Sequence, residues 1–175
     1  MRGNVDIPLD GLLDGVRGGD ETALRAIMKE FSPLVYGTAL SVTGSASDAE
    51  DVLQEVFIGL PEALGRFDGR NFPGWLYVVA KRRALMTVRS RDRRDGYDKR
   101  AARQNARHSE DHTLDRIAIE RALASLPEGY RSVFLLKEAQ GLSHREIAET
   151  LGISVALSQT RLFRARAALR KLLVR

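Results

Sequence analysis

Polar side chains suited to reading DNA cluster near the C-terminus, in a segment rich in arginine. Gln159 and Thr160 can both donate and accept hydrogen bonds. Arg161 and Arg164 can each form two parallel hydrogen bonds to a guanine, or contact a phosphate. Residues 153–175 contain no Asp or Glu, whereas a solvated helix face usually mixes both signs of charge. These residue types predict nucleic-acid recognition rather than bond chemistry.

Two short helices joined by a tight turn would position these side chains. Ser143 and Glu146 form a capping box at the start of the first helix, and Gly152 suits its left-handed end. Ser154 can cap the second helix. An inward stripe then follows at steps of three and four, comprising Val155, Ser158, Leu162, Ala165, Leu169 and Leu172. We expect the hydroxyl of Ser158, which lies in this stripe, to form a hydrogen bond back into the helix or to remain partly exposed. The stretch predicts a helix-turn-helix; an amphipathic hairpin with a solvated basic face is the plainer alternative.

A second group of basic side chains lies on a helix that we expect to begin at Pro73. Tyr77 is followed by Lys81, Arg82 and Arg83, and a loop rich in glycine and charge precedes the helix at residues 66–71. Aromatic and basic side chains beside a loop supply the stacking surfaces and the phosphate contacts that single-stranded nucleic acid requires. Two further aromatic residues, Phe72 and Trp75, are better explained as core.

An acidic helix forms the third candidate site. Residues 44–65 contain five acids and no base, and the acids are Asp48, Glu50, Asp51, Glu55 and Glu62. Such a patch in a basic protein predicts a protein-binding face, although acids near a helix N-terminus also stabilise the helix dipole. Ser47 and Glu50 predict a capping box here. Pro61 predicts a kink near Phe57 or an early helix end.

The remaining apolar spacing predicts further helices and no convincing strand. One helix would start after Asp20 and a new one at Ser32-Pro33, since proline favours a first turn. We predict an all-α fold of two small helical domains, residues 1–90 and 113–175, the second a helix-turn-helix. Residues 91–112 would form a flexible linker, rich in bases and poor in apolar anchors. His108 and His112 lie four apart in it, which is better explained as incidental than as a metal pair.

The composition of the chain excludes several kinds of site and several classes of protein. The chain has 175 residues, 43% of them hydrophobic and 29% charged, with a formal net charge of +5. It has no cysteine, which excludes disulfides, thiolate metal sites and thiol nucleophiles. No apolar run has the length of a membrane span, and the N-terminus lacks a signal-peptide core. We therefore expect a cytoplasmic protein without a cofactor or metal that is not an enzyme.

Several motifs in this order resemble bacterial sigma factors of the extracytoplasmic-function (ECF) group of the sigma-seventy family. They are Gly19-Asp20 with Ala23, the run from Asp48 to Glu55, Arg66-Phe67 followed by Trp75-Leu76-Tyr77, Leu126-Pro127 with residues 133–136, and residues 141–143 with Arg161-Leu162 and residues 164–166. The similarity extends from about Leu9 to Leu173. It implies a region-two domain, a connecting linker and a region-four domain.

The resemblance assigns a role to each candidate surface. Core RNA polymerase, through its beta-prime and beta subunits, would be bound with the help of Asp48, Asp51, Gln54 and Glu55 on the acidic helix. The minus-ten promoter element would be melted and read by Arg66, Phe67, Arg70, Asn71, Tyr77, Lys81, Arg82 and Arg83. The minus-thirty-five element would be read as duplex by Leu157, Gln159, Thr160, Arg161 and Arg164. An anti-sigma factor would be the regulatory partner.

The sequence departs from the common family pattern at Arg82, Met86, Ser158 and Gln159, so the resemblance leaves the promoter sequence open. A stand-alone helix-turn-helix regulator that binds an operator as a dimer is the alternative class. The C-terminal half would suit that class equally well. The acidic helix, the basic helix beside its loop and the long linker would then have no explanation.

Overall fold

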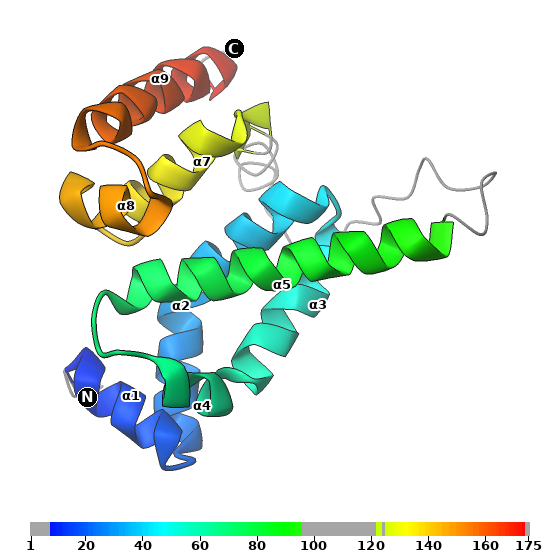
Figure 1. Ribbon diagram of the computed structural model, residues 1–175, viewed down its shortest axis with the longest axis vertical. Helices are drawn as coiled ribbons and strands as arrows, with labels where there is room; N and C mark the ends of the chain where they lie inside the picture. Colours follow the sequence, from blue (N-terminus) through cyan, green and yellow to red (C-terminus); the bar gives the residue numbers. More distant parts are fainter. Residues whose placement is uncertain (1–7, 96–121, 124, 174–175) are drawn as a thin grey trace.

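The computed structural model describes residues 8–95, 122–123 and 125–173, and every regular element within these ranges is helical (Figure 1). The prediction of an all-α fold is therefore confirmed. In the first half the elements are α1 (Leu9–Arg17), α2 (Glu21–Thr43), α3 (Ala46–Ile58), α4 (Leu60–Ala63), the 3₁₀ turn η1 (Leu64–Arg66) and α5 (Phe72–Asp95). In the second half they are α7 (Glu128–Phe134), the π-helical turn η2 (Leu135–Ala139), α8 (His144–Leu151) and α9 (Val155–Leu173).

The long helix α2 is the centre of the first half, and α1, α3 and α5 pack around it. The Asp20 carboxylate caps it by accepting a 2.8 Å hydrogen bond from Thr22 N. The predicted new helix at Ser32-Pro33 is wrong, because Pro33 lies inside α2. Proline removes one backbone donor, but the helix is buried on both sides of it through Phe31 and Leu34. This burial offsets the missing hydrogen bond.

Helix α3 begins two residues earlier than its predicted capping box. Ser45, rather than Ser47, is the N-cap, and its hydroxyl accepts a 3.3 Å hydrogen bond from Asp48 N. The helix ends at Ile58, and Pro61 lies in the first turn of α4, where its missing N–H costs little. The early helix end predicted from Pro61 is confirmed.

Helix α5 starts at an aromatic cluster and runs past the predicted domain boundary. The side-chain carbonyl of Asn71, a residue with a φ of 45°, accepts a 3.1 Å hydrogen bond from Gly74 N at the helix start. Phe72 is buried and packs edge-on against Phe31, with ring centroids 5.1 Å apart. The helix continues to Asp95, so residues 91–95 of the predicted linker are helical. Its remainder, with His108 and His112, lies outside the described residues.

The second half confirms the predicted helix-turn-helix in detail. The Ser143 and Glu146 side chains form the expected capping box, and Gly152 ends α8 with a φ of +63°. Of the predicted inward stripe on α9, Ser158, Leu162, Ala165 and Leu169 are buried. Val155 and Leu172, at the two ends of the stripe, are exposed. The stripe was therefore correct over its middle turns.

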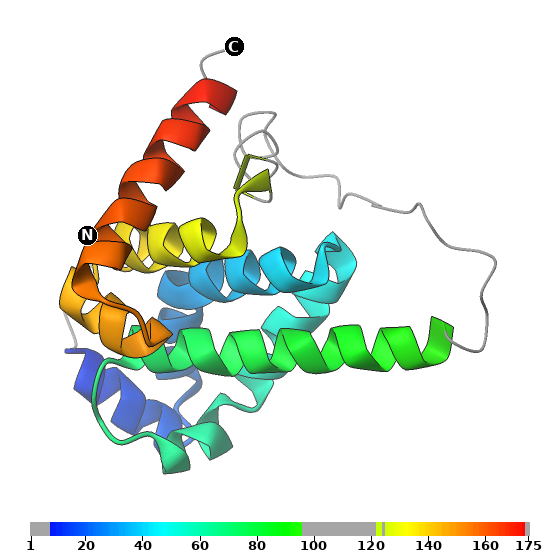
Figure 2. The same ribbon diagram turned by 45° about the horizontal axis from the view of Figure 1, so that its top comes forward.

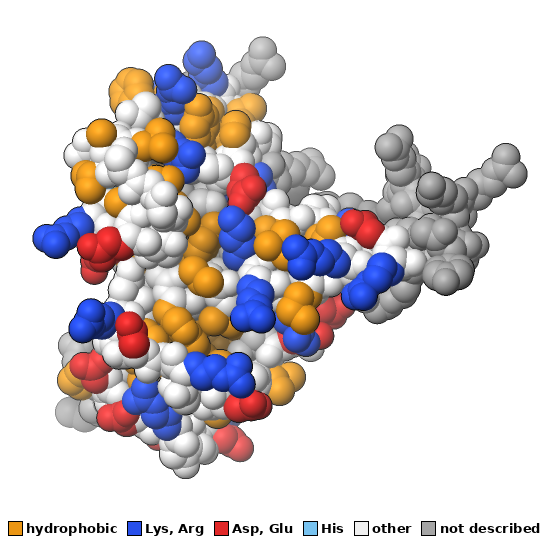
Figure 3. Space-filling view, viewed as in Figure 1, with side chains coloured by type: hydrophobic (Ala, Val, Ile, Leu, Met, Phe, Trp, Pro, Cys, Tyr) orange, Lys and Arg blue, Asp and Glu red, His pale blue; other side chains and the backbone are white. Residues whose placement is uncertain are grey.

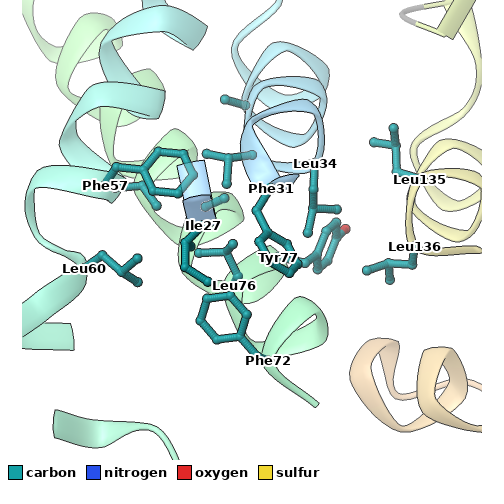
Figure 4. Packing of buried hydrophobic residues seen from close by; sticks show 14 of the residues in the cluster. Ile27, Phe31, Leu34, Phe57, Leu60, Phe72, Leu76, Tyr77, Leu135 and Leu136 are labelled. Carbon is teal, nitrogen blue, oxygen red and sulfur yellow. The ribbon is translucent and has the colours of Figure 1, made fainter. Parts of the chain in front are cut away.

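One hydrophobic core extends across both halves of the chain. Leu34 and Leu76 of the first half belong to the same buried cluster as Leu136, Ile147 and Leu162 of the second. Figure 4 shows Leu135 and Leu136 beside Leu34 and Tyr77. A smaller cluster joins α9 to the segment before α7 through Ala122, Leu126, Ala165 and Leu169. As Figure 2 shows, α7 and α8 lie directly against α2 and α5.

Candidate nucleic-acid and protein interfaces

The predicted duplex-reading side chains lie on α9, which its buried stripe fixes in place. The Ser154 hydroxyl caps the helix by accepting a 3.1 Å hydrogen bond from Leu157 N. Leu157, Gln159, Thr160 and Arg164 are exposed. The helix therefore presents several polar side chains at its N-terminal end, as helices that enter the major groove do.

Both candidate arginines of α9 lie against α7. Arg164 Nη1 donates a 3.1 Å hydrogen bond to the Tyr130 hydroxyl, and this bond raises the pKa of Arg164. Arg161 is half-buried, and its guanidinium carbon lies 3.0 Å from the position that a Cβ atom on Gly129 would occupy. A side chain at position 129 would therefore displace Arg161. The two guanidinium groups are positioned by their neighbours, which reduces the entropy lost when they bind a base or a phosphate.

The buried hydroxyl of Ser158 has a partner on the preceding helix. Its Oγ lies 2.9 Å from His144 Nδ1, so neither predicted outcome for this hydroxyl holds. His144 is half-buried, and burial lowers its pKa, with further lowering by Lys137 and Arg166. The contact joins α8 to α9 and fixes the angle between them.

The acidic helix presents the four predicted residues at the surface. Asp51, Gln54 and Glu55 are exposed, and the Asp48 side chain retains 25% of its accessibility. Two of the acids are paired with bases of α5: Arg91 Nη1 lies 2.9 Å from Asp48, and Arg83 Nε donates to Glu55. The hydrogen bond to Glu55 raises the pKa of Arg83. A protein that bound these carboxylates would compete with arginines of the same chain.

The loop before α5 divides its side chains between solvent and core. Arg66 and Arg70 are exposed. Phe67 is half-buried, with its ring centroid 5.2 Å from that of Trp75 and 5.7 Å from that of Phe72. In this arrangement Phe67 belongs to the aromatic cluster. Arg66 and Arg70 are the loop side chains available to a phosphate.

On α5, the basic and aromatic residues likewise fall into two groups. Arg82 is exposed, and Figure 3 shows Lys and Arg side chains over α5 among apolar ones. The Tyr77 side chain is only 3% exposed, and its hydroxyl donates a 2.7 Å hydrogen bond to Ser132 Oγ. Lys81 Nζ lies 2.6 Å from a carboxylate oxygen of Glu128. Tyr77 cannot stack on a base while α7 covers it.

Four residues of the second half complete these contacts, and sequence reasoning did not single them out. Glu128 and Ser132 contact α5 from α7, and Thr150 accepts a 3.1 Å hydrogen bond from Asn71 Nδ2. Arg131 Nη1 donates to the Ser41 carbonyl at 3.3 Å. Their partners lie at least 47 positions away in the sequence, which is the separation of Glu128 from Lys81, so no local spacing signals them.

Two kinds of feature are absent from residues 8–95, 122–123 and 125–173. No group of His, Asp or Glu within them is arranged to hold a metal ion. None of their helices combines the length and the apolar character that crossing a bilayer requires.

Comparisons with known proteins agree with this architecture. The Sigma-70 region 2 family matches residues 27–94, and the Sigma-70, region 4 family matches residues 116–169. The RNA polymerase sigma-H factor of Pseudomonas aeruginosa is 31% identical over 93% of this chain and 92% of its own length. The ECF RNA polymerase sigma factor SigW of Bacillus subtilis is 31% identical over 89% and 91%.

Solved structures give the same fold. CnrH, in complex with the cytosolic domain of CnrY, matches 93% of this chain and 95% of its own, with a TM-score of 0.61 and 27% identity. The sigma factor RpoE of Bartonella quintana, in complex with the anti-sigma factor NepR, matches 88% and 96%, with a TM-score of 0.66 and 24% identity. The chain belongs to the ECF group of the sigma-70 family.

Proposed function

We propose that this protein binds core RNA polymerase, directs it to specific promoters and helps to melt the DNA at the start of transcription. The observation that carries the proposal is the order of the three surfaces within the two family matches. The acidic face of α3 and the basic helix α5 adjoin within the region 2 match, and α9 presents its polar face within the region 4 match. An operator-binding dimer would use only the last surface.

Each surface takes one partner. Asp48, Asp51, Gln54 and Glu55 bind a basic surface of the polymerase. The phosphate backbone of the separated minus-ten strand is held by exposed basic side chains of the loop and of α5, among them Arg66, Arg70 and Arg82. Tyr77 reads the minus-ten element once it is uncovered. On α9, Gln159, Thr160, Arg161 and Arg164 enter the duplex of the minus-thirty-five element.

The protein contributes binding free energy, and the polymerase performs the chemistry. Contacts that form only with the separated strand favour the melted state over the closed duplex. Phosphate contacts set the register, and a few side chains on base edges specify the sequence. Neither DNA surface needs high affinity alone, because attachment of both to polymerase raises their effective concentration at the promoter. This role places the protein in the cytoplasm with the transcription machinery.

An anti-sigma factor is the proposed inhibitor. An apolar groove with a volume of about 680 Å³ lies between the two halves, with Tyr36, Leu40, Leu53, Leu123, Phe134 and Leu135 among its lining residues. An apolar helix face from a partner would be complementary to such a groove. RpoE of B. quintana was solved in complex with an anti-sigma factor, which supports the proposal by analogy.

Co-purification tests the proposal most simply. Tagged protein mixed with core polymerase in the absence of DNA should elute as a complex, because the acidic surface requires no promoter. Asp51→Arg should abolish the complex, whereas Asp14→Arg, a charge change on the exposed side chain of α1, should not. A protein that binds duplex DNA as a dimer and ignores core polymerase would contradict it.

A further inference from the structure

Helix α7 packs beside α9, and the first turn of α7 holds an aromatic side chain against it (Figure 1). Pro127 precedes the helix, and its carbonyl accepts a 2.9 Å hydrogen bond from Tyr130 N. The Tyr130 ring is half-buried and packs on the small apolar cluster that includes Ala165 and Leu169 of α9. A tyrosine side chain has few rotatable bonds, so this packing fixes its hydroxyl beside α9.

The Tyr130 hydroxyl accepts a 3.1 Å hydrogen bond from Arg164 Nη1. Ala165, the next residue of α9, is fully buried in the cluster on which the Tyr130 ring packs. One apolar cluster therefore holds the backbone of α9 beside the donor and the ring that carries the acceptor. The hydrogen bond joins two groups whose supports are rigid, although the guanidinium group itself is exposed.

This contact restricts Arg164 before DNA arrives. A long, exposed arginine side chain samples many rotamers, and it loses that freedom when it binds. The hydrogen bond to Tyr130 reduces the sampling in the free protein, so less conformational entropy is lost on binding. It uses one hydrogen of Nη1, and the edge formed by Nε and Nη2 can still donate to N7 and O6 of a guanine.

The neutral partner of Arg164 distinguishes it from other surface arginines of the chain. Arg166, on the same helix, is paired with the carboxylate of Glu138, and Arg83 is paired with Glu55. A carboxylate offsets the charge of its arginine and competes with DNA for the same donors. A phenol hydroxyl orients the guanidinium group and leaves its positive charge available to DNA. The contact is therefore suited to an arginine that reads a base.

We propose that Tyr130 is a positioning residue for promoter recognition, which sets Arg164 to read one base pair of the minus-thirty-five element. The inference rests on the proposed function. Tyr130 acts through Arg164, so its effect is confined to the base pair that Arg164 reads. Phosphate contacts, which carry no sequence information directly, do not depend on this hydrogen bond. A purely structural role would instead lower stability and weaken binding to all sequences alike.

Selection from a pool of random-sequence duplex DNA, with the full chain bound to core polymerase, tests the inference. Sequencing of the bound DNA gives the base preference at each position, and Arg164→Ala identifies the position that this arginine reads. Tyr130→Phe removes the hydroxyl and keeps the ring. We expect it to lower the preference at that same position by about two- to tenfold and to leave the other positions unchanged. Its melting temperature by circular dichroism should equal that of the wild-type protein.

A double variant tests whether the hydroxyl acts through Arg164. In the Arg164→Ala background, Tyr130→Phe should change the base preference no further, because the donor of the hydrogen bond is already absent. Glu138→Gln is the matched control, since it removes the charged partner of another exposed arginine of α9. It should leave the preference at the Arg164 position intact.

The results for the two single variants separate the inference from the function on which it rests. If Arg164→Ala removes the preference at one position and Tyr130→Phe retains it, the positioning role is overturned and the proposed function stands. A lower melting temperature of Tyr130→Phe, with equal loss at every position, would also overturn the positioning role. If the wild-type protein with core polymerase selects no sequence from the pool, the proposed function is overturned, and the inference with it.

Discussion

Arg83 of α5 donates a hydrogen bond from Nε to the carboxylate of Glu55 on α3, so one ion pair joins the proposed DNA surface to the proposed polymerase surface. Arg91 and Asp48 form a second pair between the same helices, at 2.9 Å. Both contacts lie at the surface, where the four side chains retain 25% to 45% of their accessibility, and surface pairs contribute about 0–1 kcal/mol each. They are weak enough for a partner to exchange, so binding of polymerase to the acids would release the two arginines for DNA.

The first prediction concerns this exchange. Glu55→Ala should weaken binding to core polymerase, because it removes a carboxylate from the contact surface. Arg83→Ala should leave that affinity within about fivefold, since the exposed pair contributes at most about 1 kcal/mol. Arg83→Ala should instead reduce promoter melting. Fluorescence titration with core polymerase and permanganate footprinting of the promoter measure the two effects. Equal loss of polymerase affinity in both variants would show that Arg83 itself contacts polymerase.

The second prediction concerns the recognition helix. Arg161→Ala and Arg164→Ala should each lower promoter use by about five- to 150-fold if the arginine reads a guanine, which corresponds to about 1–3 kcal/mol. Core binding should be unchanged, because both residues lie on α9, away from α3. Competition between promoter fragments measures the effect. Arg170→Ala, on an exposed residue in the last turn of α9, is the matched control. If both variants used the promoter as well as the wild-type protein does, α9 would not be the helix that reads it.

The third prediction concerns the acidic surface. Asp51→Arg reverses the charge of an exposed residue of α3 and should abolish holoenzyme formation without unfolding the protein. Circular dichroism should give an unchanged melting temperature, since the substituted side chain faces solvent. Gel filtration with core polymerase measures the binding. Intact holoenzyme from this variant would show that the polymerase contacts another surface.

The fourth prediction is a pH dependence that involves His144. Burial holds the pKa of its imidazole below the usual value of 6.5, so the unfolded chain binds a proton that the folded chain does not. Stability is therefore greatest above that value, and it falls as the pH drops through 6.5 toward the lower folded pKa. His144→Asn, which cannot titrate, should lack this part of the loss. Thermal unfolding at a series of pH values from about 7.5 to about 5 measures this loss of stability in the two proteins. Parallel curves for the two proteins would contradict the assignment.

Local signals in the sequence predicted the start or the end of a helix where the residues concerned lie close together in the chain. Ser143 and Glu146 lie three residues apart, and their capping box forms as predicted. Pro61 ended α3 as expected. Two local signals were misleading. Ser45, rather than Ser47, caps α3. Helix α2 continues through Pro33, because the turns on either side of this residue are buried.

Contacts between distant segments could not be predicted in this way. The partner of Ser158 lies on another helix, and the partners of Tyr77 and Lys81 lie beyond the segment that joins the two halves. Periodicity shows that Ser158 faces inward, but it does not show what the hydroxyl meets. Spacing therefore indicates which helix face a residue occupies, whereas the covering of Tyr77 and Lys81 by the other half of the chain could not be predicted from it.

Run-off transcription from genomic DNA with purified core polymerase tests the central claim most directly. The account predicts discrete start sites that depend on this protein, that share sequence at two upstream elements, and that Asp51→Arg eliminates. Transcription indistinguishable from that of core polymerase alone would contradict it.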